Sequence, residues 1–287
     1  EQFWEAAWLD ANVAVSQPHR AVLTDRAMPP NREIPNEVWF PGVRFNFAQH
    51  LLRYRDERVA LIAEAEGQPR RTVTYEDLFR VVASAAAALK SLGVEPGDRV
   101  AAFMPNTIET VIAMLATAAI GAVWSSTSPD FGFQGVMDRF GQIDPKVLIC
   151  SDGYRYHGKA HETVDKAARL AESIGSIRHV VIVPFLGIAG RKLPHALGWR
   201  EFITLGAQEA VVNGEPTLSF PQTPFDYPLY ILYSSGTTGQ PKCIVHGAGG
   251  TLLKHHVEQK FHTDLRRDDV LFYFTTCGWM MWNWLVG

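Results

Sequence analysis

Hydrophobic residues recur at helical spacing in the stretch that follows Thr74. Two acidic residues come soon after this threonine, and leucine, valine and alanine then repeat at intervals of three and four until Gly93. A threonine N-cap, acidic residues in the first turn and a terminal glycine are the usual signals at the two ends of a helix. The pattern therefore predicts an amphipathic helix between Thr74 and Gly93.

Short apolar runs alternate with further helical patterns along the middle of the chain. Strands are predicted at residues 99–104, 122–124, 146–150 and 179–183, and helices at residues 109–120, 131–142 and 161–173. Strands that alternate with helices of about ten to fifteen residues are typical of parallel sheets covered on both faces. The sequence therefore predicts an α/β fold.

The remaining segments suggest how the chain is divided. Residues 1–71 form an irregular, proline-bearing lead-in, and residues 72–287 are expected to form the first part of a large α/β domain. Glycine and proline become frequent in residues 186–224, which predicts a linker or a long surface excursion between two sheet-forming halves. The chain begins with Glu1 and ends in an apolar run at Gly287, so we expect it to be a piece of a longer protein.

Composition and charge exclude several classes of protein. The chain has 287 residues, of which 47% are hydrophobic and 20% charged, and this excludes disordered and collagen-like proteins. A net charge of −3 provides no basic field that would attract nucleic acid or an anionic membrane. Gly121 and the polar residues after it interrupt the uncharged stretch at residues 110–129, so we expect no membrane insertion.

The cysteines and histidines do not form a metal-binding pattern. Three cysteines lie far apart in the sequence, which argues against a disulfide framework and a zinc site and favours a cytoplasmic location. The neighbouring His255 and His256 would point in different directions on a helix. We therefore assign no protein residue to a metal.

A loop rich in hydrogen-bond donors follows an apolar, strand-like run at residues 229–233. Glycines let a backbone approach phosphate closely, N–H and hydroxyl groups donate to its oxygens, and a lysine supplies charge. The spacing differs from the phosphate-binding loop of nucleoside triphosphatases, and Pro241 precedes the lysine. A polar hairpin loop with an exposed lysine is the alternative. The expected phosphate ligands are Ser234, Ser235, Gly236, Thr237, Thr238, Gly239 and Lys242.

The run Tyr-Ile-Leu-Tyr-Ser-Ser-Gly-Thr-Thr-Gly-Gln-Pro-Lys at residues 230–242 resembles the signature loop of the adenylate-forming acyl-CoA synthetases. Cys243 departs from the wider superfamily, in which glycine commonly follows this lysine. The motifs Gly-Asp-Arg-Val-Ala and Ala-Ile-Gly-Ala-Val are also typical of that superfamily. Four stretches are more similar to its acetoacetate-specific branch, the acetoacetyl-CoA synthetases, than to acetyl-CoA synthetases: residues 39–46, 125–132, 138–146 and 278–283.

This resemblance implies the truncated N-terminal part of an AMP-binding domain, with mostly parallel sheets flanked by helices. It also implies an enzyme of lipid and ketone-body metabolism that uses ATP and Mg²⁺ to convert acetoacetate into an acyl-adenylate, from which the thiol of CoA then displaces AMP. Lys242 and Thr238 are the residues expected to act in catalysis. Acetate or another short-chain acid is an alternative substrate, and a non-catalytic nucleotide-binding fragment is an alternative function. A dinucleotide-dependent dehydrogenase is a third alternative, but no G-x-G-x-x-G motif follows a predicted strand in this sequence.

The resemblance also implies an acyl pocket, a CoA site and groups outside this sequence. The acyl pocket is expected to follow a strand at residues 270–274 and to contain Trp279, Met280, Met281 and Trp282, although a packed core helix explains these residues equally well. Phe40, Gly42, Arg155 and Lys159 are expected to bind CoA, with solvated surface charge as the alternative for the two basic residues. The magnesium and ribose ligands and the adenylation lysine are expected beyond Gly287. We therefore expect the chain to pack against its own C-terminal portion and to be inactive alone.

Overall fold

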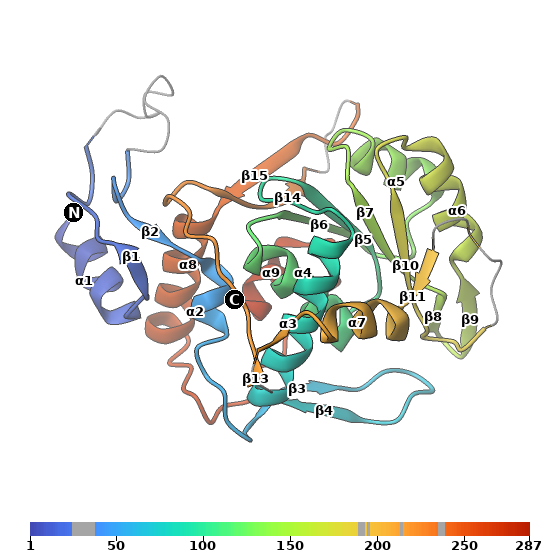
Figure 1. Cartoon of the computed structure of the whole chain (residues 1–287), viewed down its shortest axis with the longest axis horizontal. Helices are drawn as coiled ribbons and strands as arrows, with labels where there is room; N and C mark the ends of the chain where they lie inside the picture. The colour runs from blue at the N-terminus through green and yellow to red at the C-terminus, as the bar shows by residue number, and fades with distance from the viewer. Residues whose placement is uncertain (25–37, 189–192, 194–195, 213–214, 235–238) are drawn as a thin grey trace.

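The computed structural model describes residues 1–24, 38–188, 193, 196–212, 215–234 and 239–287. Its centre is a seven-stranded sheet in the order β11-β10-β7-β5-β6-β14-β15 (Figure 1). Every neighbouring pair in this sheet is parallel except β14 and β15, which are antiparallel. This is the mainly parallel α/β sheet that the sequence predicts. The strands are β5 (Arg99–Phe103), β6 (Val123–Thr127), β7 (Val147–Ser151), β10 (His179–Val183), β11 (Ala196–Gly198), β14 (Pro228–Tyr233) and β15 (Cys243–Gly247).

Helices cover both faces of the sheet, as the alternation along β5 shows. Val100 and Ala102 join one hydrophobic cluster with helices α3, α4 and α7, whereas Ala101 and Phe103 join a second cluster with α5 and α6. Successive side chains of a strand point to opposite faces, so a strand buried on both faces reads as one continuous apolar run. The helices are α3 (Tyr75–Ser91), α4 (Ile108–Ala119), α5 (Phe133–Phe140), α6 (Val164–Ser173) and α7 (Trp199–Ala207).

The residues just before α3 and α6 determine where these two helices begin. The hydroxyl of Thr74 accepts a hydrogen bond from the backbone N–H of Asp77 at 3.1 Å, which confirms the predicted N-cap. The helix predicted at residues 161–173 begins later, at Val164, because the residues before it pair in a hairpin of β8 (Gly153–Tyr156) and β9 (Lys159–Glu162). Hydrogen bonding to a neighbouring strand therefore shortens this helix at its start.

The predicted linker at residues 186–224 is wrong for much of its length. Its residues supply edge strand β11 and helix α7, and Phe202 of α7 is fully buried against the rest of the core. A Cβ added at Gly206 would lie 1.8 Å from the backbone oxygen of Ser84, so α7 packs directly on the backbone of α3. A single large sheet, rather than two halves, occupies the described part of the chain.

The strand expected at residues 270–274 does not form. These residues have no regular secondary structure, and the side chain of Phe274 is 90% exposed. A strand requires a neighbour that pairs with its backbone, and no described strand pairs with these residues. An apolar run that looks like a strand therefore remains uncovered here.

The N-terminal lead-in shares the main core through aromatic contacts. The rings of Phe40 and Phe225 stack with their centroids 4.8 Å apart, and Trp8 of α1 packs on Phe40 at 5.1 Å.

No helix in the described part of the chain is long and apolar enough to cross a bilayer. The other elements are α1 (Gln2–Ala11), β1 (Val15–Gln17), β2 (Arg44–Phe45), α2 (Phe47–Leu51), β3 (Val59–Ala63), β4 (Arg71–Thr74), β12 (Val211–Val212), β13 (Glu215–Pro216), α8 (Ala248–His256), the π-helix η1 (Val257–His262) and α9 (Met280–Val286).

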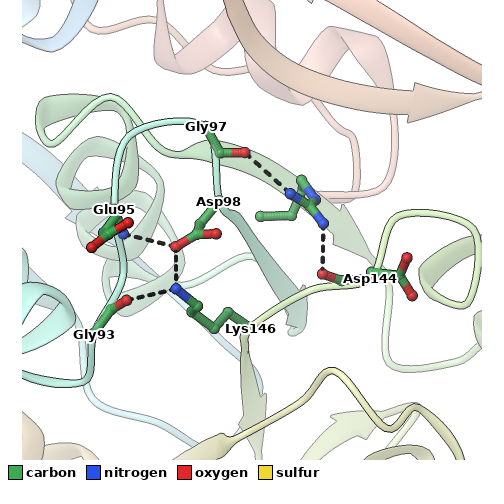
Figure 2. A network of polar contacts seen from close by, with 7 residues as sticks. Gly93, Glu95, Gly97, Asp98, Asp144 and Lys146 are labelled. Carbon is green, nitrogen blue, oxygen red and sulfur yellow. Dashed lines mark hydrogen bonds and ion pairs between the residues drawn. The ribbon is translucent and has the colours of Figure 1, made fainter.

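A polar network ties together the amino ends of β5 and β7 (Figure 2). The ammonium group of Lys146 donates to the carboxylate of Asp98 at 2.5 Å and to the backbone oxygen of Gly93 at 2.7 Å. The guanidinium of Arg99 donates to the backbone oxygens of Ile143, at 2.5 Å, and Asp144, at 3.0 Å. Partial burial raises the pKa of the Asp98 carboxyl, but Lys146, the backbone N–H of Glu95 and the charge of Arg99 together outweigh this effect and hold the pKa below its usual value.

Candidate functional site

The predicted site residues gather mainly beyond the carboxyl ends of the parallel strands. Because β5, β6, β7 and β14 are parallel, their carboxyl ends share one edge of the sheet. After β5 the chain adds β6 on one side and then β7, β10 and β11 on the other, so the winding direction reverses between β5 and β7. Ligands of open α/β sheets bind outside the carboxyl ends at such a reversal. The donor-rich loop leaves β14 at this edge.

Ser234 and Lys242 close the base of that loop. The backbone N–H of Ser234 donates to the backbone oxygen of Lys242 at 3.0 Å, and the N–H of Lys242 donates to the Ser234 hydroxyl at 3.3 Å. Gly239 has a φ of +137°, a backbone conformation that favours glycine. Ser235, Gly236, Thr237 and Thr238 lie outside the described residues. The loop joins an antiparallel hairpin, a shape that both a phosphate site and a plain polar turn would share.

The side chain of Lys242 is exposed and has no ion-pair partner among the residues that the structure describes. Other lysines of the chain are engaged, such as Lys146 with Asp98. A lysine whose backbone is fixed and whose ammonium group is not neutralised can bind an anionic ligand as a point charge. Lys242 therefore has the properties that a phosphate contact requires.

Tyr233 anchors the strand that enters the loop. The hydroxyl of Ser125 donates to the backbone oxygen of Ile231 at 3.0 Å and therefore accepts from the Tyr233 hydroxyl, which lies 2.9 Å away. Burial raises the pKa of Tyr233 far above its usual value, so the phenol stays protonated and keeps donating. Tyr233, the last residue of β14, is thus hydrogen-bonded to Ser125 of β6.

A second cluster, the turn at residues 275–279, lies directly on the ends of β5 and β6. The Cys277 thiol is fully buried and lies 2.9 Å from the backbone oxygen of Met104, while Ser126 donates to the Cys277 backbone oxygen at 2.6 Å. Burial raises the pKa of this thiol to about 12. Because the thiolate is the nucleophilic form, Cys277 is a packing residue rather than a reactive one.

The four residues expected in the acyl pocket divide between surface and core. Trp279 is 63% exposed, and Met280 and Met281 lie at or near the surface. Trp282 has no exposed surface, and its indole N–H donates to the side-chain oxygen of Asn106 at 2.8 Å. The core interpretation therefore describes the surroundings of Trp282, while the acyl-pocket assignment stays a prediction for all four residues.

The four residues expected to bind CoA fall into two separate regions. Arg155 and Lys159 are exposed on the β8–β9 hairpin, and Gly42 follows the buried Phe40 in the lead-in. The hairpin and the part of the lead-in that contains α1, β1 and β2 lie on opposite sides of the molecule (Figure 1). The structure thus does not bring the two pairs together, and their assignment to CoA stays a prediction.

Three buried hydroxyls at the carboxyl edge lack hydrogen-bond partners among the described residues. They belong to Thr127, at the end of β6, to Ser151, at the end of β7, and to Thr276, in the turn at residues 275–279. A buried polar group without a partner costs about 1–3 kcal/mol, so such groups are candidates for contact with a ligand. Sequence reasoning missed them, although the polar run Ser125-Ser-Thr-Ser128 at the end of an apolar strand was a visible signal.

The described residues contain no group of three or more His, Cys, Asp or Glu side chains that could hold a metal ion. The site instead offers hydroxyls, backbone N–H groups and a lysine, which suit phosphate oxygens. This geometry agrees with a comparison with known families, in which the model of the AMP-binding enzyme family matches residues 47–286. The chain belongs to this family.

Relatives of this AMP-binding chain carry the name acetoacetyl-CoA synthetase. Those of Rhizobium meliloti (strain 1021) and Gallus gallus are 47% and 42% identical to it, each over 99% of this chain and 42% of the relative. The solved structure of acetoacetyl-CoA synthetase from Streptomyces lividans matches with a TM-score of 0.88 and 44% identity, over 99% of this chain and 42% of that one. The chain is therefore a homologue of these proteins and spans about 42% of their length.

Proposed function

We propose that the full-length protein is an ATP-dependent, AMP-forming acetoacetate–CoA ligase. The observation that supports this proposal best is the 42–47% identity to acetoacetyl-CoA synthetases across 99% of the chain. The proposed enzyme acts in the cytoplasm, in lipid and ketone-body metabolism. Its partners are its small-molecule substrates and its own C-terminal portion.

The proposed reaction has two steps. A carboxylate oxygen of acetoacetate attacks the α-phosphorus of ATP, and the bond to pyrophosphate breaks, which gives acetoacetyl-AMP and pyrophosphate. The sulfur of CoA then attacks the carbonyl carbon, the bond to AMP breaks, and the thiol proton passes to solvent. The products are acetoacetyl-CoA, AMP and pyrophosphate. The first step brings two anions together, so positive charge and directed donors are what the protein must supply.

In this proposal the donor-rich loop binds the β- and γ-phosphates. Lys242 supplies the positive charge, and its ammonium has no competing carboxylate among the described residues. The hydroxyls of Ser234, Ser235, Thr237 and Thr238 and the backbone at Gly236 and Gly239 supply the remaining donors. Lys242 and Thr238 are the proposed catalytic residues, since they would contact the phosphate oxygens on which charge develops.

Magnesium enters the proposal as part of the MgATP substrate. The described residues contain no cluster that could hold the ion by itself. A triphosphate carries Mg²⁺ on its own oxygens and needs only one or two protein carboxylates in addition. We propose that these ligands, the ribose ligand and the adenylation lysine come from the remainder of the full-length protein.

The acyl and CoA sites complete the proposal. Trp279, Met280 and Met281 directly follow Cys277, which contacts the ends of β5 and β6, and such bulky side chains would shorten a pocket to fit a small acid. Arg155 and Lys159 are exposed cations that would meet a phosphate of CoA, and Phe40 and Gly42 would contact another part of CoA.

The test is acetoacetate-dependent exchange between ATP and labelled pyrophosphate, measured on the full-length protein with Mg²⁺. Acetate, butyrate and malonamate serve as competing acids, and formation of acetoacetyl-CoA is followed by mass spectrometry. The proposal expects exchange and thioester formation with acetoacetate at the highest kcat/KM of the four acids. A higher kcat/KM for acetate, butyrate or malonamate would show that this acid, and not acetoacetate, is the preferred substrate. ATP binding without exchange for any acid would support the non-catalytic alternative.

A further inference from the structure

Gln142 joins the end of helix α5 to the residues on both sides of Lys242. Its side-chain N–H₂ group donates to the backbone oxygen of Pro241 at 2.8 Å and to the backbone oxygen of Asp138. Its side-chain oxygen faces the thiol of Cys243 at 3.7 Å. Both donors and the acceptor of one amide are thus used, and two of the three contacts go to the immediate neighbours of Lys242.

The backbone of Lys242 is held from the opposite side as well. Ser234 makes two hydrogen bonds to it, at 3.0 Å and 3.3 Å. The chain is therefore clamped between Ser234 and Gln142, while the ammonium group stays free of carboxylates in the described part of the chain. A fixed backbone combined with an uncompensated charge is the arrangement expected of a residue that binds a ligand at a defined place.

Helix α5 also contacts the other end of the loop. The guanidinium of Arg139 lies 4.6 Å from the ring centroid of Phe131 and 5.7 Å from that of Tyr233, the residue before Ser234. Arg139 is itself fixed by donating to the backbone oxygen of Gly135 at 2.6 Å. The start of the loop is therefore supported by α5, and its end by Gln142, which directly follows that helix.

We infer that Gln142 is a positioning residue that places Lys242 for adenylate formation. This inference rests on the function proposed above. Displacement of a catalytic group by about 1 Å can slow a reaction by about a hundredfold, and Gln142, which follows α5, contacts the end of the loop where Lys242 lies. The β- and γ-phosphates are present only in the first step, since pyrophosphate has left before CoA reacts. Loss of Gln142 should therefore slow the first step and spare the second.

The first experiment compares Gln142→Glu, Gln142→Ala and a control in the full-length protein. Glutamate has nearly the size of glutamine but cannot donate to Pro241. The matched control is Gln134→Glu, because Gln134 lies on α5 and donates to Asp138, at 2.6 Å, but makes no hydrogen bond to the described residues of the loop. We expect kcat for acetoacetate-dependent pyrophosphate exchange to fall about tenfold to a hundredfold in both Gln142 variants. Transfer from preformed acetoacetyl-AMP to CoA, and both rates in the control, should stay within about twofold.

The two half-reactions separate positioning from general damage to the fold. An equal fall in both steps, or an unchanged exchange rate in Gln142→Glu, would overturn the inference. Wild-type protein without any acetoacetate-dependent exchange would instead refute the proposed function. The contact between Gln142 and the loop then still requires a test that does not depend on turnover.

Alkylation of Cys243 provides that test. Cys243 is exposed, whereas Cys150 and Cys277 are buried, so the two buried thiols serve as internal references. The three cysteine-containing peptides are quantified by mass spectrometry after brief treatment with N-ethylmaleimide. We expect Cys243 to react several-fold faster in Gln142→Ala than in wild type, with no change at Cys150 or in Gln134→Glu. An unchanged rate at Cys243 would show that Gln142 does not hold this segment, and the inference would fail.

Discussion

The two edges of the central sheet are built in opposite ways. At the amino edge the charges are matched: Lys146 pairs with Asp98 and also binds a backbone oxygen, and Arg99 binds the backbone that leads into β7 (Figure 2). At the carboxyl edge Lys242 has no ion pair within the described residues, and the hydroxyls of Thr127 and Ser151 have no partner there. The polar groups named at the amino edge are therefore paired within the protein, whereas those at the carboxyl edge remain available to a ligand.

This difference indicates where stability and function lie in the molecule. Matched polar groups at the ends of β5 and β7 hold neighbouring strands in register and leave nothing to offer a ligand. Unmatched groups at the opposite edge lower stability unless a ligand satisfies them. We therefore expect substitutions at the amino edge to change the free energy of unfolding, and substitutions at the carboxyl edge to change the reaction.

Lys242→Ala should give the largest effect on the reaction. We expect adenylate formation by the full-length protein to slow by about tenfold to a thousandfold, the range for loss of one contact to developing charge. The melting temperature should hardly change, because an exposed lysine contributes little to stability. Pyrophosphate exchange and thermal unfolding of the same preparation check both points. An unchanged exchange rate would remove Lys242 from the mechanism.

Trp282→Ala tests whether Trp282, one of the four residues expected in the acyl pocket, contacts the substrate or belongs to the core. Trp282 is fully buried and donates to Asn106, so truncation should lower the free energy of unfolding by about 3–5 kcal/mol. The loss of activity should then be similar for acetoacetate, butyrate and hexanoate. A selective gain in kcat/KM for the longer acids would instead place Trp282 in the acyl pocket.

Lys146→Ala is the counterpart of Lys242→Ala at the amino edge. It leaves the partly buried carboxylate of Asp98 without its partner at 2.5 Å, so we expect a loss of about 1–3 kcal/mol in the free energy of unfolding. The rate of pyrophosphate exchange per folded molecule should stay unchanged. Denaturant unfolding and active-site titration measure the two quantities. A large fall in exchange with intact stability would contradict the division between the two edges.

Acid titration separates the amino edge from two buried histidines. Burial, with the charge of Arg53 adding to it, lowers the pKa of His50 from 6.5 to about 3, and burial lowers that of His255 to about 4. The unfolded chain binds these protons more readily, so stability should fall as the pH drops below 6.5, by about 1 kcal/mol per histidine and pH unit. Asp98 has a lowered pKa, so its contribution should be lost only as the pH falls below 3.8.

Denaturant unfolding between pH 7 and pH 3 checks this order. Substitution of His50 or His255 by Gln should flatten the slope between pH 6.5 and 5, whereas Asp98→Asn should leave that part of the curve unchanged. The same slope in the histidine variants and the wild type would mean that other groups cause the loss of stability.

Much of the fold could be predicted because its signals are local. The Thr74 cap, the apolar strands and the loop between Ser234 and Lys242 can each be recognised from the types of a few neighbouring residues. Helix α7 could not be predicted, because its position depends on the contact of Gly206 with the backbone of α3, which no local pattern encodes. The run at residues 270–274 misled for a related reason: its composition favours a strand, but no described strand pairs with it.

The candidate site was predictable in chemistry rather than in geometry. The loop residues indicated phosphate, but three tryptophans within a short stretch could not reveal that Trp282 is buried while Trp279 is exposed. The lack of hydrogen-bond partners for the hydroxyls of Thr127 and Ser151 depends on how distant segments pack around them. The contact of Gln142 with Pro241 also joins residues far apart in the sequence. Such features follow from the packing of the whole sheet and require a structure.

The position of the triphosphate of bound ATP tests the central claim most directly. It can be measured in a crystal structure of the full-length protein with Mg²⁺ and a non-hydrolysable ATP analogue. Our account predicts that the β- or γ-phosphate lies about 2.7–3.2 Å from the Lys242 ammonium, beyond the carboxyl ends of β6 and β14. Phosphates bound at the amino edge near Lys146, or at the carboxyl edge without contact to Lys242 or the loop that it ends, would contradict it.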